Sequence, residues 1–252
     1  VIIPAPTFAE YALNGQIEGA RVVNVPIKQD SGRYNYQAIL KALTEQTRLI
    51  WLCNPNNPTG AYESVADLRE FMKQVPSNVL VLIDEAYIQY VTDVAQPSAL
   101  PLLKEFKNIG IMRTFSKVYG LANFRVGYIV LPSQLASYLQ RIRLPYNLNS
   151  VSQKAASVAI ADQEFIRQCV TKNAAERDKW EKFLKDVGLP FFHSQANFVF
   201  FQVDAADQLA SDLLKNGFQV RTGLLPNWLR ITVGQASDNQ KLQQLIRQFL
   251  SK

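Results

Sequence analysis

Short apolar runs alternate with amphipathic stretches over the first half of the chain. Runs of strand length occupy residues 21–25, 48–53, 79–83, 109–112 and 126–130. Between them, apolar positions recur at helical spacing in residues 7–18, 36–43, 64–75 and 100–106, and Thr7 and Ser64 are suitable N-caps. Strands and helices that alternate in this way predict crossover connections and a largely parallel sheet. The run at 126–130 can be antiparallel, because its link to the preceding strand is short.

The pattern changes near Pro145. Residues 150–187 show an increasingly charged helical pattern, with Pro190 beyond its end. Short strands are then predicted at 198–201, 219–221 and 229–233, and amphipathic helices at 207–216 and 239–250. Two helices on a small sheet form an α+β unit. We therefore predict a larger α/β domain at residues 1–147 and a smaller α+β domain at residues 148–252, entered through the long helix.

Composition narrows the classes of protein that remain. With 252 residues, 48% of them hydrophobic, the chain can bury one large core and one smaller core. The net charge is +6, but Lys and Arg are scattered among Asp and Glu, so we expect no nucleic-acid partner. The two cysteines, Cys53 and Cys169, are too few for a disulfide framework, which indicates a reduced, intracellular setting.

Two further observations narrow the chemistry and the location. His193 is the only histidine, which excludes a multi-histidine metal site and leaves no good candidate for a Ser-His-Asp triad, and we expect no metal. We interpret His193 as an ordinary polar residue. No apolar run reaches the length of a membrane span and no signal peptide is visible, so we expect a cytoplasmic protein without a membrane partner.

Candidate functional residues follow three of the predicted apolar strands in the sequence. Asn54-Pro55-Asn56-Asn57-Pro58-Thr59-Gly60 follows the first, and Asp84-Glu85-Ala86-Tyr87 follows the second. Arg113-Thr114-Phe115-Ser116-Lys117 follows the third and is succeeded by Arg125. An open α/β sheet binds its ligands at the carboxyl ends of its strands. A lysine after a buried strand, with hydroxyls before it and an arginine after it, suits the formation of an imine with a phosphorylated aldehyde.

These three blocks, in this order, resemble the pyridoxal-5'-phosphate aminotransferases of fold type I. The run at 113–128 looks most like the histidinol-phosphate aminotransferases, and the likeness extends from Pro4-Ala5-Pro6-Thr7-Phe8 to Leu229-Arg230-Ile231-Thr232-Val233-Gly234. The resemblance implies a mostly parallel sheet flanked by helices, a smaller C-terminal α+β domain, bound pyridoxal phosphate and a homodimer. It also implies two small-molecule partners, an amino donor and a 2-oxo acid.

The resemblance assigns the catalytic roles to three residues. Lys117 would act first as a nucleophile toward the cofactor aldehyde and then as the general base at the substrate α-carbon. Asp84 would pair with the protonated pyridine nitrogen, which opposes the rise in carboxyl pKa that burial causes. Tyr87 would hydrogen-bond the ring oxygen of the cofactor.

Further residues are predicted to hold the cofactor and the substrate. The phosphate would be bound by Arg125, Ser116 and Thr114. Asn57 would contact both the ring oxygen and the substrate. Phe8 lies where the family places an aromatic residue against the pyridine face, although a core aromatic is the competing interpretation, and Tyr11 is a weaker candidate.

Two arginines of the second domain are the predicted substrate ligands. Arg230, on the strand at 229–233, would bind a carboxylate or phosphate of the substrate. Arg221 would bind the phosphate of a substrate such as histidinol phosphate, and an exposed arginine at a strand end is the alternative.

These assignments predict transfer of the amino group from histidinol phosphate to 2-oxoglutarate, giving imidazole acetol phosphate and glutamate. An aromatic amino-acid aminotransferase and a threonine-phosphate decarboxylase-like enzyme are the alternatives, and a non-catalytic module that binds pyridoxal phosphate is a further one. Val1-Ile2-Ile3-Pro4 has no initiator methionine and reads like the end of a buried strand. We therefore expect a fragment that lacks the family's N-terminal part, where a helix amino terminus would cradle the cofactor phosphate.

Overall fold

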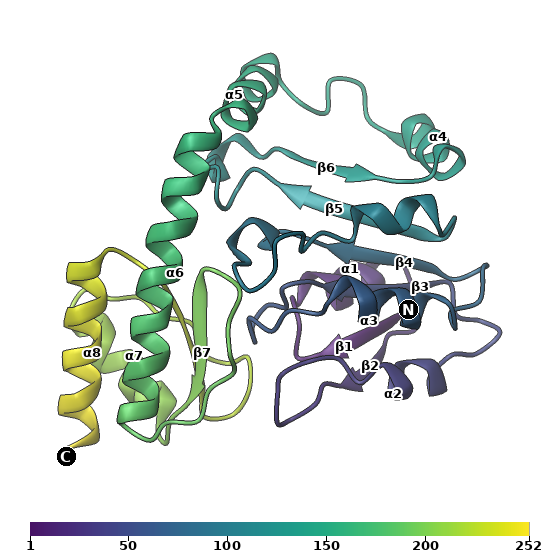
Figure 1. The fold of residues 1–252 in the computed structure, drawn as a ribbon. Coiled ribbons are helices and arrows are strands. Elements are labelled where there is room, and N and C mark those ends of the chain that lie inside the picture. The colour runs from purple at the N-terminus through teal and green to yellow at the C-terminus, as the bar shows by residue number, and fades with distance from the viewer. Residues whose placement is uncertain (252) are drawn as a thin grey trace.

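A six-stranded sheet forms the framework of the first half of the molecule (Figure 1). The computed structural model describes residues 1–251. The strand order is β2-β1-β3-β4-β5-β6; neighbouring strands are parallel except for β6, which is antiparallel to β5. The strands are β1 (Ile2–Ala5), β2 (Val23–Pro26), β3 (Leu49–Cys53), β4 (Leu80–Asp84), β5 (Ile109–Thr114) and β6 (Gly127–Val130). This arrangement confirms the predicted parallel sheet and its antiparallel edge strand.

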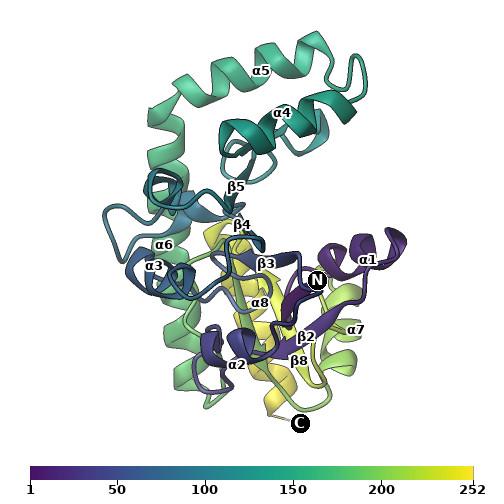
Figure 2. The same ribbon diagram turned by 90° about the vertical axis from the view of Figure 1, so that its right-hand side faces the viewer.

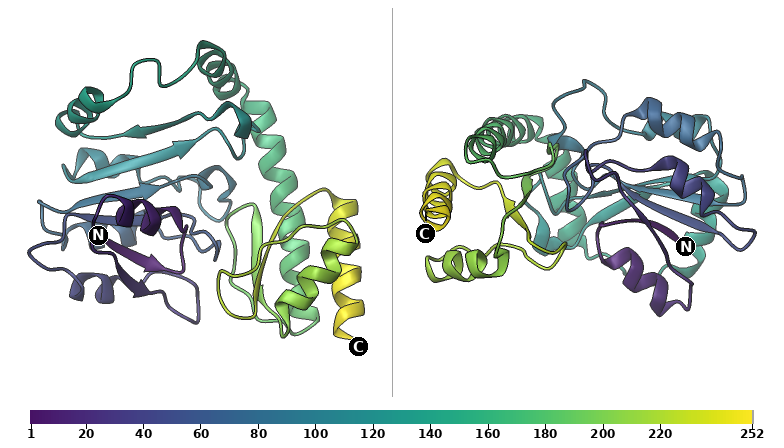
Figure 3. Two further views of the ribbon diagram at one scale, coloured as in Figure 1. Left: turned by 180° about the vertical axis from the view of Figure 1, so that it is seen from behind. Right: turned by 90° about the horizontal axis from the view of Figure 1, so that it is seen from below.

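Helices cover both faces of this sheet. Figure 3 (right) shows α1 on one face and α2 and α3 on the other. The helical segments are α1 (Glu10–Ile17), α2 (Tyr36–Lys41), α3 (Val65–Met72) and three short 3-10 turns, η1 (Ile88–Tyr90), η2 (Leu100–Lys104) and η3 (Ala122–Phe124). Fully buried side chains such as Ile50, Val81 and Phe71 fill the space between the strands and the helices α2 and α3. The inner strands β3, β4 and β5 therefore read as continuous apolar runs because they are buried on both faces, whereas the edge strand β6 is partly exposed.

Of the two predicted helix N-caps, one is confirmed and one is wrong. Ser64 caps α3 as expected, because its side-chain oxygen accepts a hydrogen bond from the Asp67 amide. The prediction of Thr7 as a cap was wrong: α1 begins at Glu10 without a side-chain cap. The Thr7 hydroxyl instead donates to Asn56 Oδ1 at 2.8 Å, which ties the start of the chain to the loop after β3.

Three helices connect the large sheet to the C-terminal part of the chain: α4 (Ser133–Ile142), α5 (Ser150–Ala161) and α6 (Gln163–Asp186). Figures 1 and 2 show α4 and α5 beyond the β6 edge of the sheet. The single helical pattern predicted at 150–187 is thus two helices. They meet at Asp162, whose side chain accepts from the Phe165 amide and caps α6. The domain boundary expected at residue 147 falls between α4 and α5 and stays a prediction.

The C-terminal part is a two-stranded antiparallel sheet with helices packed on it (Figure 3, left). It consists of β7 (Phe198–Gln202), β8 (Trp228–Thr232), α7 (Ala206–Lys215), α8 (Ala236–Leu250) and the second half of α6. The predicted strand at 219–221 is only a single bridge between Arg221 and Arg230. No helix within residues 1–251 is both long enough and apolar enough to cross a membrane.

Candidate active site

A cavity of about 460 Å³ opens at the carboxyl ends of β3, β4 and β5. Every residue predicted to hold the cofactor lines it: Phe8, Asn57, Asp84, Tyr87, Thr114, Ser116, Lys117 and Arg125. Two cavities elsewhere are larger, at about 530 and 580 Å³, but neither contains any of these residues. We therefore identify the site by the chemistry of its lining and not by its size.

Asp84 is the last residue of β4, and two hydrogen bonds fix its carboxylate. Oδ2 accepts from the Tyr11 hydroxyl at 2.7 Å, and Oδ1 accepts from the Ala86 amide at 3.0 Å. The Tyr11 ring in turn stacks on Trp51, with centroids 4.7 Å apart and planes 5° from parallel. Burial raises the pKa of the Asp84 carboxyl, while these hydrogen bonds and the charge of Lys117 oppose that rise.

Lys117 follows β5 and reaches toward the same part of the cavity. Its Nζ lies 5.4 Å from the centroid of the Tyr87 ring. Burial lowers the pKa of the Lys117 ammonium group, and the positive charges of Arg230 and Arg125 lower it further, while Asp84 opposes them. A larger share of this amine is therefore unprotonated at neutral pH than for an exposed lysine, as a nucleophile or base requires.

The loop between β5 and β6 presents the groups predicted to hold a phosphate. Thr114 Oγ1 accepts from the Ser116 amide at 3.0 Å, which shapes the turn before Lys117. Arg125 has a left-handed backbone, with φ 55° and ψ 41°, and its Nη1 donates to the Ala122 carbonyl at 2.9 Å. For a residue with a side chain this conformation costs about 1–2 kcal/mol. Arg125 shares it with Tyr146, Ala205 and Asn227, which lie outside the cavity.

The base of this loop is anchored by a buried ion pair that sequence reasoning missed. Glu85 is fully buried, and Arg113 Nη2 lies 2.7 Å from its Oε2. Ser98 and the Ala99 amide also donate to the Glu85 carboxylate. Glu85 directly follows Asp84, and Arg113 lies on β5 shortly before Lys117, so this pair ties the end of β4 to the end of β5.

Arg230 approaches from β8, on the other side of the site. Its Nη1 donates to Asn57 Oδ1 at 2.5 Å, and its guanidinium carbon lies 4.9 Å from the Phe198 ring centroid. Arg230 Nε is buried and has no hydrogen-bond partner. Burial also lowers the pKa of Arg230. The side chain thus retains an unused donor, as expected for a residue that binds an anion.

Neither Arg230 nor Arg221 lines the cavity itself, although Arg230 borders it through its hydrogen bond to Asn57. Arg221 lies farther away. Its backbone pairs with that of Arg230, with N–O distances of 3.1 and 2.9 Å, but its side chain is exposed. Its charge is nevertheless close enough to lower the pKa of Arg230.

Two other features of the cavity were not predicted. The hydrogen bond between the Tyr11 hydroxyl and Asp84 joins residues far apart in sequence. Cys53 also lines the cavity, and burial raises the pKa of its thiol to about 12. The thiol donates to the Pro55 carbonyl at 3.3 Å, so Cys53 is a buried neutral side chain and not a nucleophile.

The residues present fit pyridoxal phosphate. A fixed carboxylate, an amine of lowered pKa and a loop carrying hydroxyls and an arginine all line the one cavity, matching the ring nitrogen, aldehyde and phosphate of the cofactor.

Comparisons with known proteins agree with this chemistry. The family model "Aminotransferase class I and II" matches residues 1–249. The histidinol-phosphate aminotransferase of Lactiplantibacillus plantarum is 51% identical over 99% of the chain, and that of Limosilactobacillus fermentum is 48% identical over 100%. The chain spans 70% of the length of each of these two relatives.

Solved structures show the same fold. The histidinol-phosphate aminotransferase of Sinorhizobium meliloti, in complex with pyridoxal-5'-phosphate, superposes with a TM-score of 0.89 at 27% identity, covering 99% of this chain and 71% of that one. A structure from Erwinia carotovora atroseptica, described as a putative histidinol-phosphate aminotransferase, gives 0.93 at 26% identity, covering 99% and 74%. The chain therefore belongs to the class I and II aminotransferases, which are pyridoxal-phosphate enzymes of fold type I.

Proposed function

We propose that the protein transfers the amino group of histidinol phosphate to 2-oxoglutarate, giving imidazole acetol phosphate and glutamate. The observation that carries this proposal is its 51% identity, over 99% of the chain, to a histidinol-phosphate aminotransferase. The site is consistent with it, because Arg230 offers a buried, unpaired donor to a substrate anion.

The cofactor would be held by residues from three strand ends. Asp84 would bind the pyridine nitrogen, and Ser116, Thr114 and Arg125 would bind the phosphate. Tyr87 and Asn57 would donate to the ring oxygen, with Phe8 against the ring face. Because Asn57 Oδ1 already accepts from Arg230, its amide NH2 group is the part that remains to donate. When bound, pyridoxal phosphate withdraws electrons from the substrate α-carbon.

Lys117 would move the proton that this withdrawal makes acidic. Its lowered pKa leaves the amine free to accept a proton from the substrate α-carbon. The resulting ammonium group can then donate that proton to the bound cofactor. Arg230 would hold the anionic end of the substrate, so that the reacting carbon stays beside Lys117. Asn57 would orient Arg230 and contact the substrate itself.

The proposed donor is tested by a half-reaction. Protein loaded with pyridoxal phosphate is mixed rapidly with histidinol phosphate, phenylalanine, glutamate or threonine phosphate. The change in cofactor absorbance and any release of CO2 are followed. Glutamate is expected to react because it is the product of the proposed reaction. Among the other amines, we expect histidinol phosphate to have the highest kcat/KM. Reaction with phenylalanine but not with histidinol phosphate would instead identify an aromatic aminotransferase, and release of CO2 from threonine phosphate would identify a decarboxylase.

We also propose a cytoplasmic homodimer. The dimer is supported by apolar side chains exposed on and between α4 and α5, among them Ile142, Tyr146 and Val151, which are 76%, 100% and 67% exposed. The cytoplasmic location is supported by two cysteines that are both unpaired. Light scattering of the purified protein tests the dimer, and cell fractionation tests the location.

A further inference from the structure

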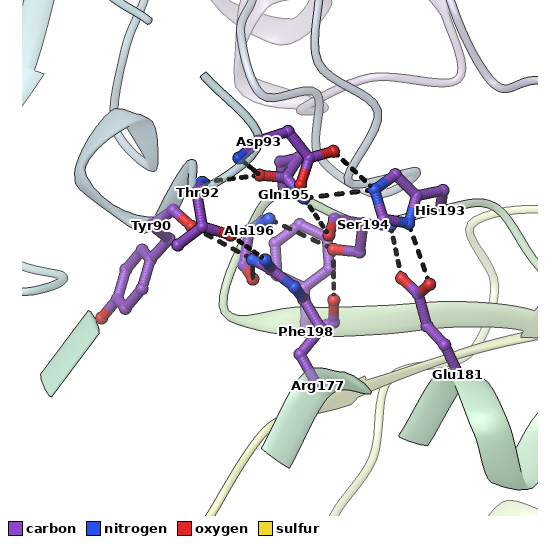
Figure 4. Close-up of polar contacts among 10 residues, drawn as sticks. All are labelled: Tyr90, Thr92, Asp93, Arg177, Glu181, His193, Ser194, Gln195, Ala196 and Phe198. Atoms are coloured by element: carbon purple, nitrogen blue, oxygen red, sulfur yellow. Dashed lines mark hydrogen bonds and ion pairs between the residues drawn. The ribbon is translucent and has the colours of Figure 1, made fainter. Parts of the chain in front are cut away.

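A buried arginine outside the cavity joins the C-terminal part of the molecule to the large sheet. Arg177 lies on α6 and is 1% exposed. Figure 4 shows its guanidinium group beside Tyr90, Thr92 and Ala196. Its Nη1 donates to the carbonyls of Tyr90 and Ala196 at 3.1 and 3.3 Å, and its Nη2 donates to Thr92 Oγ1 at 2.9 Å. Among residues 1–251, no carboxylate lies within ion-pair distance of this guanidinium.

A buried charged side chain without a carboxylate partner is not explained by core packing alone. Burying a charge costs free energy, and an apolar side chain of similar volume often stabilises a protein at least as well. Burial accordingly lowers the pKa of Arg177, opposed only by the more distant charges of Glu181, Asp178 and Asp93. The planar fork of donors, which an apolar side chain lacks, instead fixes the relative positions of three acceptors.

A neighbouring glutamine strengthens the same junction. Gln195 Oε1 accepts from the backbone amides of Thr92 and Asp93 at 2.8 and 3.3 Å, and the backbone N–H of Gln195 donates to the Gly60 carbonyl at 2.7 Å. Gly60 has φ +75°, and a Cβ there would lie 2.2 Å from Ser194 Oγ, so the two segments are in close contact. We refer to Arg177, Thr92 and Gln195 as the inter-region lock.

The contacts of the lock lie close in sequence to residues of the active site. Tyr90 comes shortly after Tyr87, and Gly60 comes shortly after Asn57. Ala196 comes just before Phe198, whose ring touches both sides of the site. It packs edge-on against Tyr87, with centroids 5.1 Å apart, and lies 4.9 Å from the Arg230 guanidinium.

We propose that Arg177 is a positioning residue for transamination. Through the inter-region lock it fixes the position of Arg230, on β8, relative to Lys117 and Tyr87, which follow strands of the large sheet. The substrate is bound by its anionic end at Arg230 and reacts beside Lys117, so both sides must be in register at once. A displacement of about 1 Å between groups that hold a reacting centre can cost about 10²-fold in rate. The inference rests on the proposed function in its choice of amino donor.

The test uses rapid-mixing half-reactions of the protein loaded with pyridoxal phosphate. Arg177→Met should lower kcat by about 10²-fold while pyridoxal phosphate still binds, because the predicted cofactor ligands lie outside the lock. KM should change much less, because Arg230 is intact. Trp180→Phe is the matched control: Trp180 lies on the same helix, is fully buried and packs in the C-terminal core. It should lower the melting temperature without lowering kcat.

A second pair of variants applies if Arg177→Met does not fold. Thr92 is exposed, so its replacement has little effect on the core. Thr92→Val removes one acceptor from the guanidinium and should lower kcat by about tenfold, whereas Thr92→Ser keeps the hydroxyl and should restore wild-type turnover. Hydrogen exchange supplies an independent readout, because the amides of Thr92 and Asp93 should exchange faster in Thr92→Val than in Thr92→Ser.

The outcomes separate this proposal from the proposed function. If histidinol phosphate does not react but phenylalanine or glutamate does, the proposed donor is wrong, and the lock is tested with the donor that reacts. Wild-type kcat in Arg177→Met and Thr92→Val overturns the lock. Faster amide exchange in Thr92→Val with unchanged kcat would also overturn it. So would a loss of kcat in Trp180→Phe equal to that in Arg177→Met, because either result would show that Arg177 has only a structural role.

Discussion

The two sides of the active-site cavity are built in different ways. On the cofactor side, the chemical groups follow adjacent strands of one parallel sheet, so the register of β3, β4 and β5 brings Asn57, Asp84 and Lys117 together. On the substrate side, Arg230 comes from a separate two-stranded sheet and is held by Asn57 and Phe198. The first side is fixed by backbone pairing, and the second depends on a few contacts between side chains far apart in sequence.

This difference predicts that the largest losses come from the chemical groups of the cofactor side. Lys117→Ala removes both the nucleophile and the base, so kcat should fall by about 10⁴-fold while the fold is retained. Rapid-mixing half-reactions with histidinol phosphate and with glutamate measure the loss. Residual turnover within tenfold of wild type with either donor would assign the proton transfer to another group.

On the substrate side, Arg221 should affect one class of donor only. If its guanidinium binds the substrate phosphate, Arg221→Ala should lower kcat/KM for histidinol phosphate by about 10²-fold, which corresponds to a charged hydrogen bond of about 2–3 kcal/mol. Phenylalanine, which carries no phosphate, is the control and should lose much less. An equal loss with both donors would show that Arg221 supports Arg230 through the backbone bridge and does not bind phosphate.

A smaller effect is expected where a side chain supports the cofactor side from a distance. Tyr11→Phe removes the 2.7 Å hydrogen bond to Asp84, which lets the pKa of that carboxyl rise further. A hydrogen bond to a charged group contributes about 1.5–3 kcal/mol, so kcat/KM should fall by about tenfold. Tyr62→Phe is the control, since the Tyr62 hydroxyl donates to the Pro97 carbonyl outside the cavity. Similar losses in both variants would count against a role for Tyr11 at Asp84.

The smallest predicted effect is a dependence of stability on pH at the junction of the two regions. Hydrogen bonds to Glu181 and Asp93 raise the pKa of His193 from 6.5 to about 9. Because the pKa is raised by folding, the stabilisation is complete below pH 6.5 and is lost as the pH rises to about 9. The His193 side chain is 58% exposed, so solvent screening limits the contribution to about 1 kcal/mol.

Urea unfolding of the wild type and of His193→Gln measures this contribution at pH 6 and at pH 9.5. At pH 6 the wild type should be more stable than His193→Gln. At pH 9.5 the two proteins should be equally stable. A difference of the same size at both values would mean that His193 acts through packing and not through its charge.

The same contrast explains what could be predicted from the sequence. Strand length and apolar runs located the large sheet. Asp84 ends β4 and Lys117 comes soon after β5, so local pattern was sufficient to place them. The contacts of Tyr11 with Asp84 and of Arg177 with Tyr90 join distant segments, which no local pattern encodes. α4 was missed because none of its residues is buried, and the break between α5 and α6 was missed because Asp162 fits a charged helical surface.

The most direct test of this account asks which lysine reacts with the cofactor. The protein is incubated with pyridoxal phosphate, reduced with borohydride, digested and mapped by mass spectrometry. The pyridoxyl label is expected on Lys117, because this lysine has a lowered pKa and lines the cavity with Asp84 and Arg125. A label on another lysine, with Lys117 unmodified, would contradict it.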